Sequence, residues 1–385
     1  RWKTPSANPQ HCTNTMYFPD SMSIEEAFAK AEAEARLAAA LKESEARFAT
    51  AEVPNRLNEN WRFGRPHKYA TALAELLQSD TPSQGDCTVQ HAGEAAVPVS
   101  SEDDDLRQTE MLMPTIGSDA LLGMHLKRFG SGYALYIEED TREPIRIEYS
   151  TSGLFTPSTF IMVAPGVKAE VVEIHQGNGD AASMFATRNI QVAEGAKLKL
   201  LLQSTGMERY MCITNIQNMG GQVIQLTRHD SHSWAREETV AEIYAPESDI
   251  QLYSANEPRN SVLDQHTSQI HHVGGATSNL LYKNVLNGNA TATFAGNIYV
   301  APGAHHTDAY QSNRNLLLSE DATVNSLPGL EILADKVRCS HGSASAPVDE
   351  EQLFYLLSRG ISREDAIDLL SYGFIKDAIE KYEQS

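Results

Sequence analysis

Two stretches of nearly identical sequence, V-A-P-G-V from Val163 and V-A-P-G-A from Val300, belong to a series that decides the fold. Related turn-forming stretches between them are V-A-E-G-A from 192, M-G-G-Q-V from 219, Y-A-P-E-S from 244 and V-G-G-A-T from 273. Successive starts are 29, 27, 25, 29 and 27 residues apart. The intervening residues are strand-like, with no helical stretch of useful length. Regular spacing of this size is typical of repeat proteins, so we expect a β-solenoid. A β-sandwich or jelly roll is the alternative, because glycine-containing turns punctuate any all-β protein.

Helical patterns flank this β region and divide the chain into three predicted parts. Residues 1–106 form an N-terminal helical region, residues 107–346 the β core, and residues 347–385 a C-terminal helical region. Within the first part, the Ser-, Pro-, Gly- and acid-rich stretch 79–105 reads as a linker or mobile loop. In the last part, Asp349 and Gly360 delimit one helix. A second helix opens at Ser362 and stops at Gly373, and residues 374–382 form a third.

Composition excludes several classes of function. The chain has 385 residues, with 51 acidic against 31 basic side chains and a formal charge of −20. Such a surface repels phosphate backbones and anionic lipids, so we expect neither nucleic-acid nor membrane partners. No apolar run approaches the roughly 18 residues that cross a bilayer. The four cysteines lie far apart, and we expect a reducing, cytoplasmic location.

Cys339 and His341 are the candidate metal ligands. They lie two residues apart at the end of a β-patterned run, V-R-C-S-H-G, and residues at i and i+2 of a strand face the same side. Iron in iron–sulfur clusters is held by thiolates, with histidine as a known substitute. Two ligands are too few for a complete site, so the others would come from a second chain. The structural alternative is that Cys339 is a small buried apolar residue and His341 a hydrogen-bonded turn residue.

Other histidines, one cysteine and one aromatic motif invite similar interpretations. Adjacent strand residues face opposite sides, so the pairs His271–His272 and His305–His306 are expected to face solvent or a subunit rather than to chelate a metal. A metal interpretation also exists for His229 and His232, whereas Cys212 is expected to be buried and inert. The motif at residues 61–63 is either a recognition surface or an anchored aromatic. The sequence contains no P-loop, G-x-S-x-G, HExxH or dinucleotide-binding fingerprint, so any ATP-driven step belongs to a partner.

Several motifs, taken in order, resemble the SufB/SufD family of iron–sulfur cluster assembly scaffolds. They are L-L-Y-K-N-V-L-N-G-N-A from Leu280, V-A-P-G-A-H-H-T-D-A-Y-Q-S-N-R-N-L-L-L-S from Val300, L-E-I-L-A-D-K-V-R-C-S-H-G, and L-F-Y-L-L-S-R-G-I-S. The C-S-H-G run resembles the SufD branch, because the SufB branch carries an E-H-E-A type sequence there. The resemblance is dense over residues 264–374 and thinner over 127–172. The chain departs from the family pattern at S-A-S-A-P, residues 343–347.

The resemblance implies a right-handed parallel β-helix between two helical regions. It implies a non-enzymatic scaffold that pairs with a SufB-like paralogue and docks a SufC-like ABC-type ATPase through its C-terminal helices. Clusters would assemble at the interface of the two scaffolds, with His341, and less directly Cys339, as this chain's ligands. The isolated chain would hold no stable cofactor, only a transient cluster or iron at the interface, and could form a homodimer. The alternative functions are a carbohydrate-active β-helix enzyme, such as a polysaccharide lyase or hydrolase, and a self-associating structural β-helix.

Overall fold

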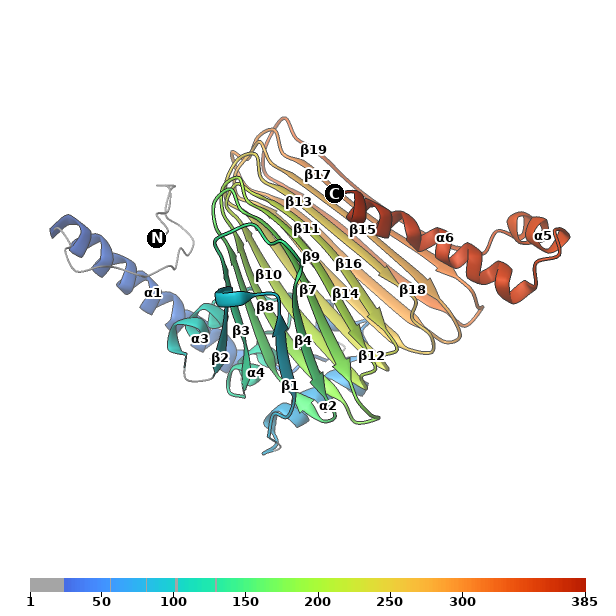
Figure 1. Ribbon diagram of the computed structural model, residues 1–385, viewed down its shortest axis with the longest axis horizontal. Coiled ribbons are helices and arrows are strands. Elements are labelled where there is room, and N and C mark those ends of the chain that lie inside the picture. The colour runs from blue at the N-terminus through green and yellow to red at the C-terminus, as the bar shows by residue number, and fades with distance from the viewer. Residues whose placement is uncertain (1–23, 56, 81, 101–102, 129) are drawn as a thin grey trace.

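The protein is a parallel β-solenoid of two sheets, with helices packed on its outer faces (Figure 1). The computed structural model describes residues 24–385 except residues 56, 81, 101, 102 and 129. Sheet A contains, in spatial order, β1 (Asp86–Gln90), β4 (Ile145–Thr151), β7 (Lys168–Gly177), β9 (Lys197–Thr205), β11 (Gln222–Asp230), β13 (Asp249–Asn256), β15 (Thr277–Leu286), β17 (Asp308–Leu317) and β19 (Arg338–Pro347). Sheet B contains β18 (Thr323–Ile332), β16 (Thr291–Val300), β14 (Val262–His271), β12 (Trp234–Ile243), β10 (Arg209–Asn218), β8 (Ser183–Val192), β6 (Pro157–Val163), β3 (Ser131–Ile137) and β2 (Ala96–Ser100), with β5 (Leu154–Phe155) beside β8.

The chain alternates between the two sheets, and all ladders from β3 to β19 are parallel. The solenoid prediction is therefore confirmed, and the sandwich alternative is wrong. Each of the six repeated turn stretches contains one residue with a left-handed backbone, namely Gly166, Gly195, Gly220, Glu247, Gly275 and Gly303. Glycine adopts this conformation without steric penalty. A left-handed residue, glycine in five of these six turns, thus marks the reversal of the chain.

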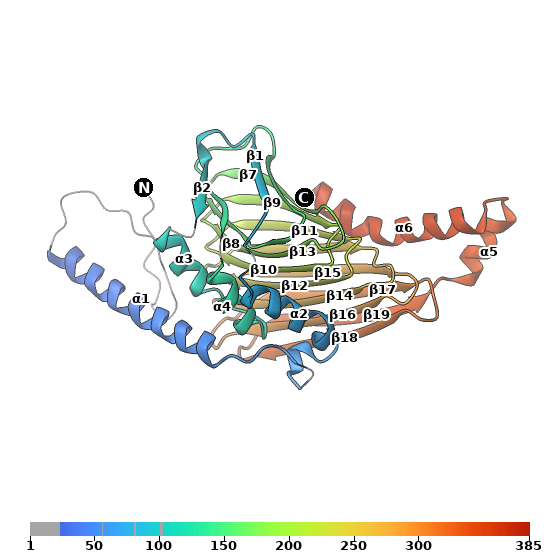
Figure 2. The ribbon, with the colours of Figure 1, turned by 90° about the horizontal axis from the view of Figure 1, so that it is seen from below.

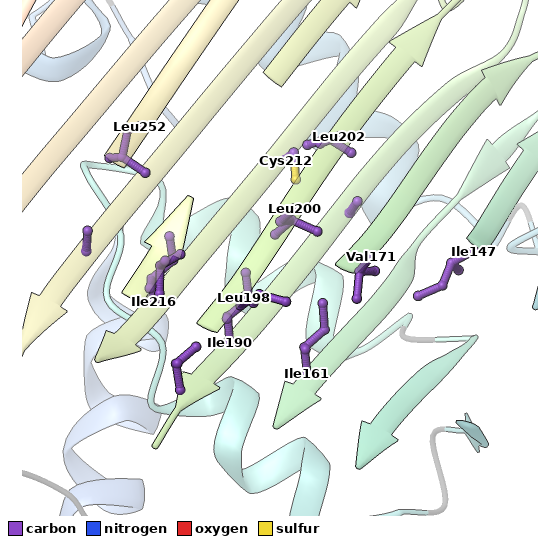
Figure 3. Packing of buried hydrophobic residues seen from close by; sticks show 14 of the residues in the cluster. Ile147, Ile161, Val171, Ile190, Leu198, Leu200, Leu202, Cys212, Ile216 and Leu252 are labelled. Atoms are coloured by element: carbon purple, nitrogen blue, oxygen red, sulfur yellow. The ribbon is translucent and has the colours of Figure 1, made fainter. Parts of the chain in front are cut away.

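Apolar side chains from both sheets fill the space between them. Figure 3 shows Leu198, Leu200 and Leu202 of β9 together with Ile190 of β8 and Ile216 of β10. All five are at most 1% exposed. Burial alternates along β9, as expected for a strand with one face inward.

The N-terminal end of the solenoid is covered by two antiparallel strands. β1 pairs with β4, and β2 pairs with β3. The prediction of a linker or mobile loop over residues 79–105 is wrong at these strands. Cys87, Val89 and Ala96 pack against the core cluster. This tertiary contact outweighs the turn-rich local composition.

N-terminal helices cover the outer face of sheet B (Figure 2). They are η1 (Glu59–Trp61), α2 (Pro66–Gln78), α3 (Asp104–Met111) and α4 (Asp119–Leu126), and α1 (Ile24–Thr50) packs against α3 and α4. The short helix η2 (Gly93–Ala95) instead connects β1 to β2. α3 and α4 extend into the region predicted as pure β core, and sequence reasoning missed them. Trp61 is fully buried, stacks on Trp234 at 6.1 Å between ring centroids, and donates Nε1–H to the Gly117 carbonyl at 2.8 Å. The anchored-aromatic interpretation is therefore confirmed for Trp61.

Two C-terminal helices, α5 (Glu350–Ser358) and α6 (Arg363–Gln384), complete the fold. The Asp349 side chain caps α5, and Gly360 follows it with a φ of 83°. The predicted stop at Gly373 is wrong, because α6 continues through it. Glycine lowers helix propensity by only about 1 kcal/mol. Packing of Ile375 and Tyr382 on the outer face of sheet A outweighs that loss. Among the described residues, no helix is long and apolar enough to cross a membrane.

Candidate functional site

The C-terminal end of the solenoid is open. In the described part of the chain, β18 pairs only with β16, and β19 only with β17. Each of these two strands therefore presents one row of unpaired backbone groups, which favours pairing with another chain. Large apolar side chains are exposed at the same end, from Leu327 at 40% to Leu333 at 50%. Leu330 and Ile332 continue the inward-facing positions of β16 and lack a further coil to cover them.

β19 places Cys339 and His341 on the inward-facing side of this open end. Their register partners on β17 are Ala309 and Gln311, both at most 2% exposed. The predicted same-face arrangement thus follows from the register, and the two Cα atoms are about 6.6 Å apart at strand spacing. His341 is exposed because β19 is the last strand of its sheet, whereas Cys339 is half-buried.

The thiol of Cys339 lies at the edge of a small apolar cluster formed by Ile298, Val300, Ala304 and Ala309. Burial raises the pKa of the Cys339 thiol above its usual value, so the protonated form prevails at neutral pH. A cysteine ligates metal as thiolate. Within the described residues, no group of three histidine, cysteine or acidic side chains is placed to hold a metal ion. The open end therefore offers an incomplete ligand set, and the assignment of His341 and Cys339 as ligands stays a prediction.

A ladder of amide side chains inside the solenoid ends at the same opening. Asn256 Nδ2 donates to Asn284 Oδ1 at 2.9 Å, and Asn284 Nδ2 donates to Asn315 Oδ1 at 3.0 Å. Asn315 Nδ2 donates in turn to Ser345 Oγ at 3.2 Å, on the exposed strand β19. Such a ladder holds consecutive coils in one register and reaches the surface at Ser345, on the same strand as His341.

The C-terminal helices present a second exposed apolar surface. Phe354 is 72% exposed, and Tyr355, Leu369 and Tyr372 are between 52% and 57% exposed. The C-terminal half of α6 packs on sheet A, whereas α5 projects away from the sheets (Figure 1). Several large exposed apolar side chains on neighbouring helices are typical of a protein interaction site.

Three of the histidines considered as metal ligands from the sequence lie inside the protein. His271 is fully buried and its Nε2 lies 2.8 Å from Ser278 Oγ, so the prediction that it faces solvent or a subunit is wrong. It occupies an inward position of β14, and only its neighbour His272 faces outward. His229 and His232 are also buried, and both rings hydrogen-bond to Ser204 Oγ, at 2.7 and 2.8 Å. His305 and His306 are exposed as expected, and Cys212 is fully buried with its pKa raised to about 12 by burial.

Sequence reasoning missed a buried ionic cluster between the sheets. Arg188 Nε donates to Glu173 Oε2 at 2.9 Å, and His175 Nε2 lies 2.8 Å from Glu173 Oε1. All three side chains are fully buried. Burial favours the neutral carboxyl, but Arg188, His175 and Thr159 outweigh it and lower the pKa of Glu173 to about 2. The only signal in the sequence is a charged residue at an inward position of an apolar strand.

The fold and the open end define a parallel β-solenoid whose candidate ligands, Cys339 and His341, form an incomplete set within the described residues. The family model "SUF system FeS cluster assembly, SufBD core domain" matches residues 146–374, more than half of the chain. The chain therefore belongs to the SufB/SufD family. Membership favours cluster assembly over the carbohydrate-active alternative.

Individual relatives place the chain nearer the SufD branch. The Escherichia coli iron-sulfur cluster assembly protein SufD is 38% identical over 146 residues, which cover 38% of this chain and 34% of that protein. A SufBD family protein of Synechocystis is 32% identical over 218 residues, 56% of this chain and 43% of the relative. A SufBD family protein of Mycobacterium tuberculosis is 27% identical over 367 residues, 86% of this chain and 85% of the relative. The match thus spans a third to a half of the first two relatives' length.

Proposed function

We propose that this protein is a non-enzymatic scaffold subunit of cytoplasmic iron–sulfur cluster assembly. Its open end pairs with a SufB-like paralogue, and its C-terminal helices dock a SufC-like ABC-type ATPase. A transient cluster, or iron, assembles where the two scaffolds meet. The observation that carries the proposal is the open, apolar end of the solenoid, with Cys339 and His341 on its inward-facing side.

Two features of the open end support pairing with a second chain, namely unpaired backbone groups and exposed apolar side chains. The unpaired edges of β18 and β19 gain backbone hydrogen bonds when a second chain adds to them. The exposed side chains of Leu327, Leu330, Ile332 and Leu333 become buried by the same contact. In the absence of the paralogue, a second copy of this chain satisfies the same groups and gives a homodimer.

Pairing of two scaffold chains at the open end also accounts for the incomplete ligand set of this chain. His341 supplies an imidazole that a paired scaffold can complete with its own ligands. Cys339, with its raised pKa, supports the site and becomes a thiolate ligand only when a metal replaces its proton. The ATPase contact rests on the exposed surface of Phe354, Tyr355, Leu369 and Tyr372.

The test is anaerobic reconstitution of the co-purified complex with iron and sulfide. We expect His341→Ala to lower iron and acid-labile sulfide content while the partners still co-purify. Cys339→Ala should lower it less. His91→Ala is the matched control, because His91 is an exposed histidine near the capped end, where it pairs with Glu143. Cluster content equal to wild type in His341→Ala would assign the imidazole a structural role only.

Docking is tested separately by capture of the purified ATPase. Tyr355→Ala/Tyr372→Ala should weaken capture, and Tyr136→Ala, which removes a 40% exposed tyrosine on β3, should not. Undiminished capture by the double variant would remove α5 and α6 from the ATPase interface.

A further inference from the structure

A pocket of about 360 Å³ lies on the outer face of sheet B, away from the inward-facing positions of Cys339 and His341. Its lining residues come from the segment before α2 and from the first residues of β16 and β18, namely Arg62, Phe63, Arg65, Thr291, Thr323 and Asn325. These are two guanidinium groups, two hydroxyls, one amide and one aromatic ring. None of the described residues that line the pocket carries a carboxylate, although the whole chain has a formal charge of −20.

The fold holds the two guanidinium groups in place. Arg65 Nη2 donates to Thr291 Oγ1 at 2.7 Å, which ties the N-cap of α2 to β16. Arg65 has a left-handed backbone with a φ of 53°, a conformation that is sterically unfavourable for a residue with a Cβ. Arg62 lies over the ring of Phe63, with Cζ 5.5 Å from the ring centroid.

The solenoid repeat supplies the remaining donors. Thr291 and Thr323 are register partners on neighbouring coils, so their side chains lie on the same outward-facing side. Asn325 follows two residues later on that side. Among the described residues, neither Arg62 nor Arg65 forms an ion pair within 4 Å, so both charges remain available to a ligand.

From this geometry we infer that the pocket binds a small polyvalent oxyanion, with two or more phosphate or carboxylate groups. Guanidinium groups bind both kinds of oxyanion through charge-assisted, often bidentate, hydrogen bonds. Five donor-bearing side chains in 360 Å³ exceed what a single phosphate needs, and the volume falls in the range of small-molecule pockets. The pocket borders the proposed pairing edge at β18, but binding of the oxyanion requires no partner chain.

Isothermal titration of the isolated protein with pyrophosphate, citrate, orthophosphate and acetate, at constant ionic strength, tests this inference. We expect pyrophosphate and citrate to bind at least tenfold more tightly than orthophosphate and acetate. Arg62→Gln/Arg65→Asn should weaken their binding at least tenfold. Asparagine suits position 65 because it tolerates a left-handed backbone and caps helices well.

The matched control is Arg142→Gln/Arg314→Gln, which removes the same charge at two exposed arginines outside the pocket. Affinity should be unchanged in this control, and Thr323→Val should weaken binding without altering charge. Equal weakening in both double variants would mean non-specific attraction and would overturn the inference. Absence of oxyanion binding to the isolated protein would also overturn the inference. This holds even if Arg62→Gln/Arg65→Asn weakens capture of the paralogue, because the pocket would then be part of the protein interface.

Discussion

Replacing Arg188 with Met leaves the carboxylate of Glu173 buried without its guanidinium partner. The pKa of Glu173 is about 2 rather than 4.5. At about 1.4 kcal/mol per unit, this difference corresponds to about 3 kcal/mol of stabilisation of the charged form. Removing one partner of a buried ion pair destabilises proteins by about 3–5 kcal/mol. We therefore expect Arg188→Met to lower the free energy of unfolding by about 3 kcal/mol at pH 7.5.

The assay is urea-induced unfolding followed by circular dichroism in the β region. Arg188→Met/Glu173→Leu removes both charges and should recover most of the loss, because apolar replacements of a buried pair are often neutral or stabilising. Burial lowers the pKa of His175, Glu173 raises it, and Arg188 lowers it further. Without Arg188, His175 therefore gains a proton more readily as the pH falls and pairs with Glu173. The penalty of the single variant should thus be smaller at pH 6 than at pH 7.5.

Two results would refute this reasoning. A single variant as stable as wild type would mean that Glu173 does not carry a buried charge. A double variant as unstable as the single variant would mean that Arg188 stabilises the core through packing alone.

Three further predictions concern titration, reactivity and helix propensity. Burial lowers the pKa of His232 to about 3, so the unfolded state binds an extra proton between pH 6.5 and 3. The free energy of unfolding should therefore fall on acidification through this window, by up to about 1.4 kcal/mol per pH unit, and His232→Asn should show a smaller slope. Cys212 should resist iodoacetamide at pH 8 in the native protein and react in urea, as measured by mass spectrometry; labelling without urea would contradict its burial. Gly373→Ala should raise the free energy of unfolding by about 0.4–1 kcal/mol, because no atom lies within 4 Å of the added Cβ, and a loss of stability would show that the helix needs glycine there.

The sequence predicted those parts of the fold that local chemistry determines. Each coil needs a reversal with a left-handed residue, so glycines such as Gly166 and Gly303 mark the coils directly. β1 and β2 could not be recognised, because their pairing with the end of the solenoid is a tertiary contact within a turn-rich composition. Continuation of α6 through Gly373 likewise depends on its packing against sheet A.

The candidate site was predictable to a similar extent. The spacing of Cys339 and His341 predicts that both side chains lie on the same face of the strand, because successive side chains alternate between the two faces. The exposure of His341 depends on β19 being the last strand, which no local pattern encodes. The inward position of Arg188 was missed because an isolated charge in a strand is ordinarily taken to face solvent.

The two ends of the solenoid differ in the length of edge that each offers to a neighbouring molecule. Stacked β-coils with equivalent edges at both ends would add to one another and produce fibres. Here the sheets end on one side in β1 and β2, which are antiparallel to their neighbours and five residues long, and on the other side in β18 and β19, which are ten residues long. Short edge strands are one of the ways in which proteins limit strand addition. The difference therefore favours contact between two C-terminal ends, and an assembly of two solenoids, over continued growth into a fibre.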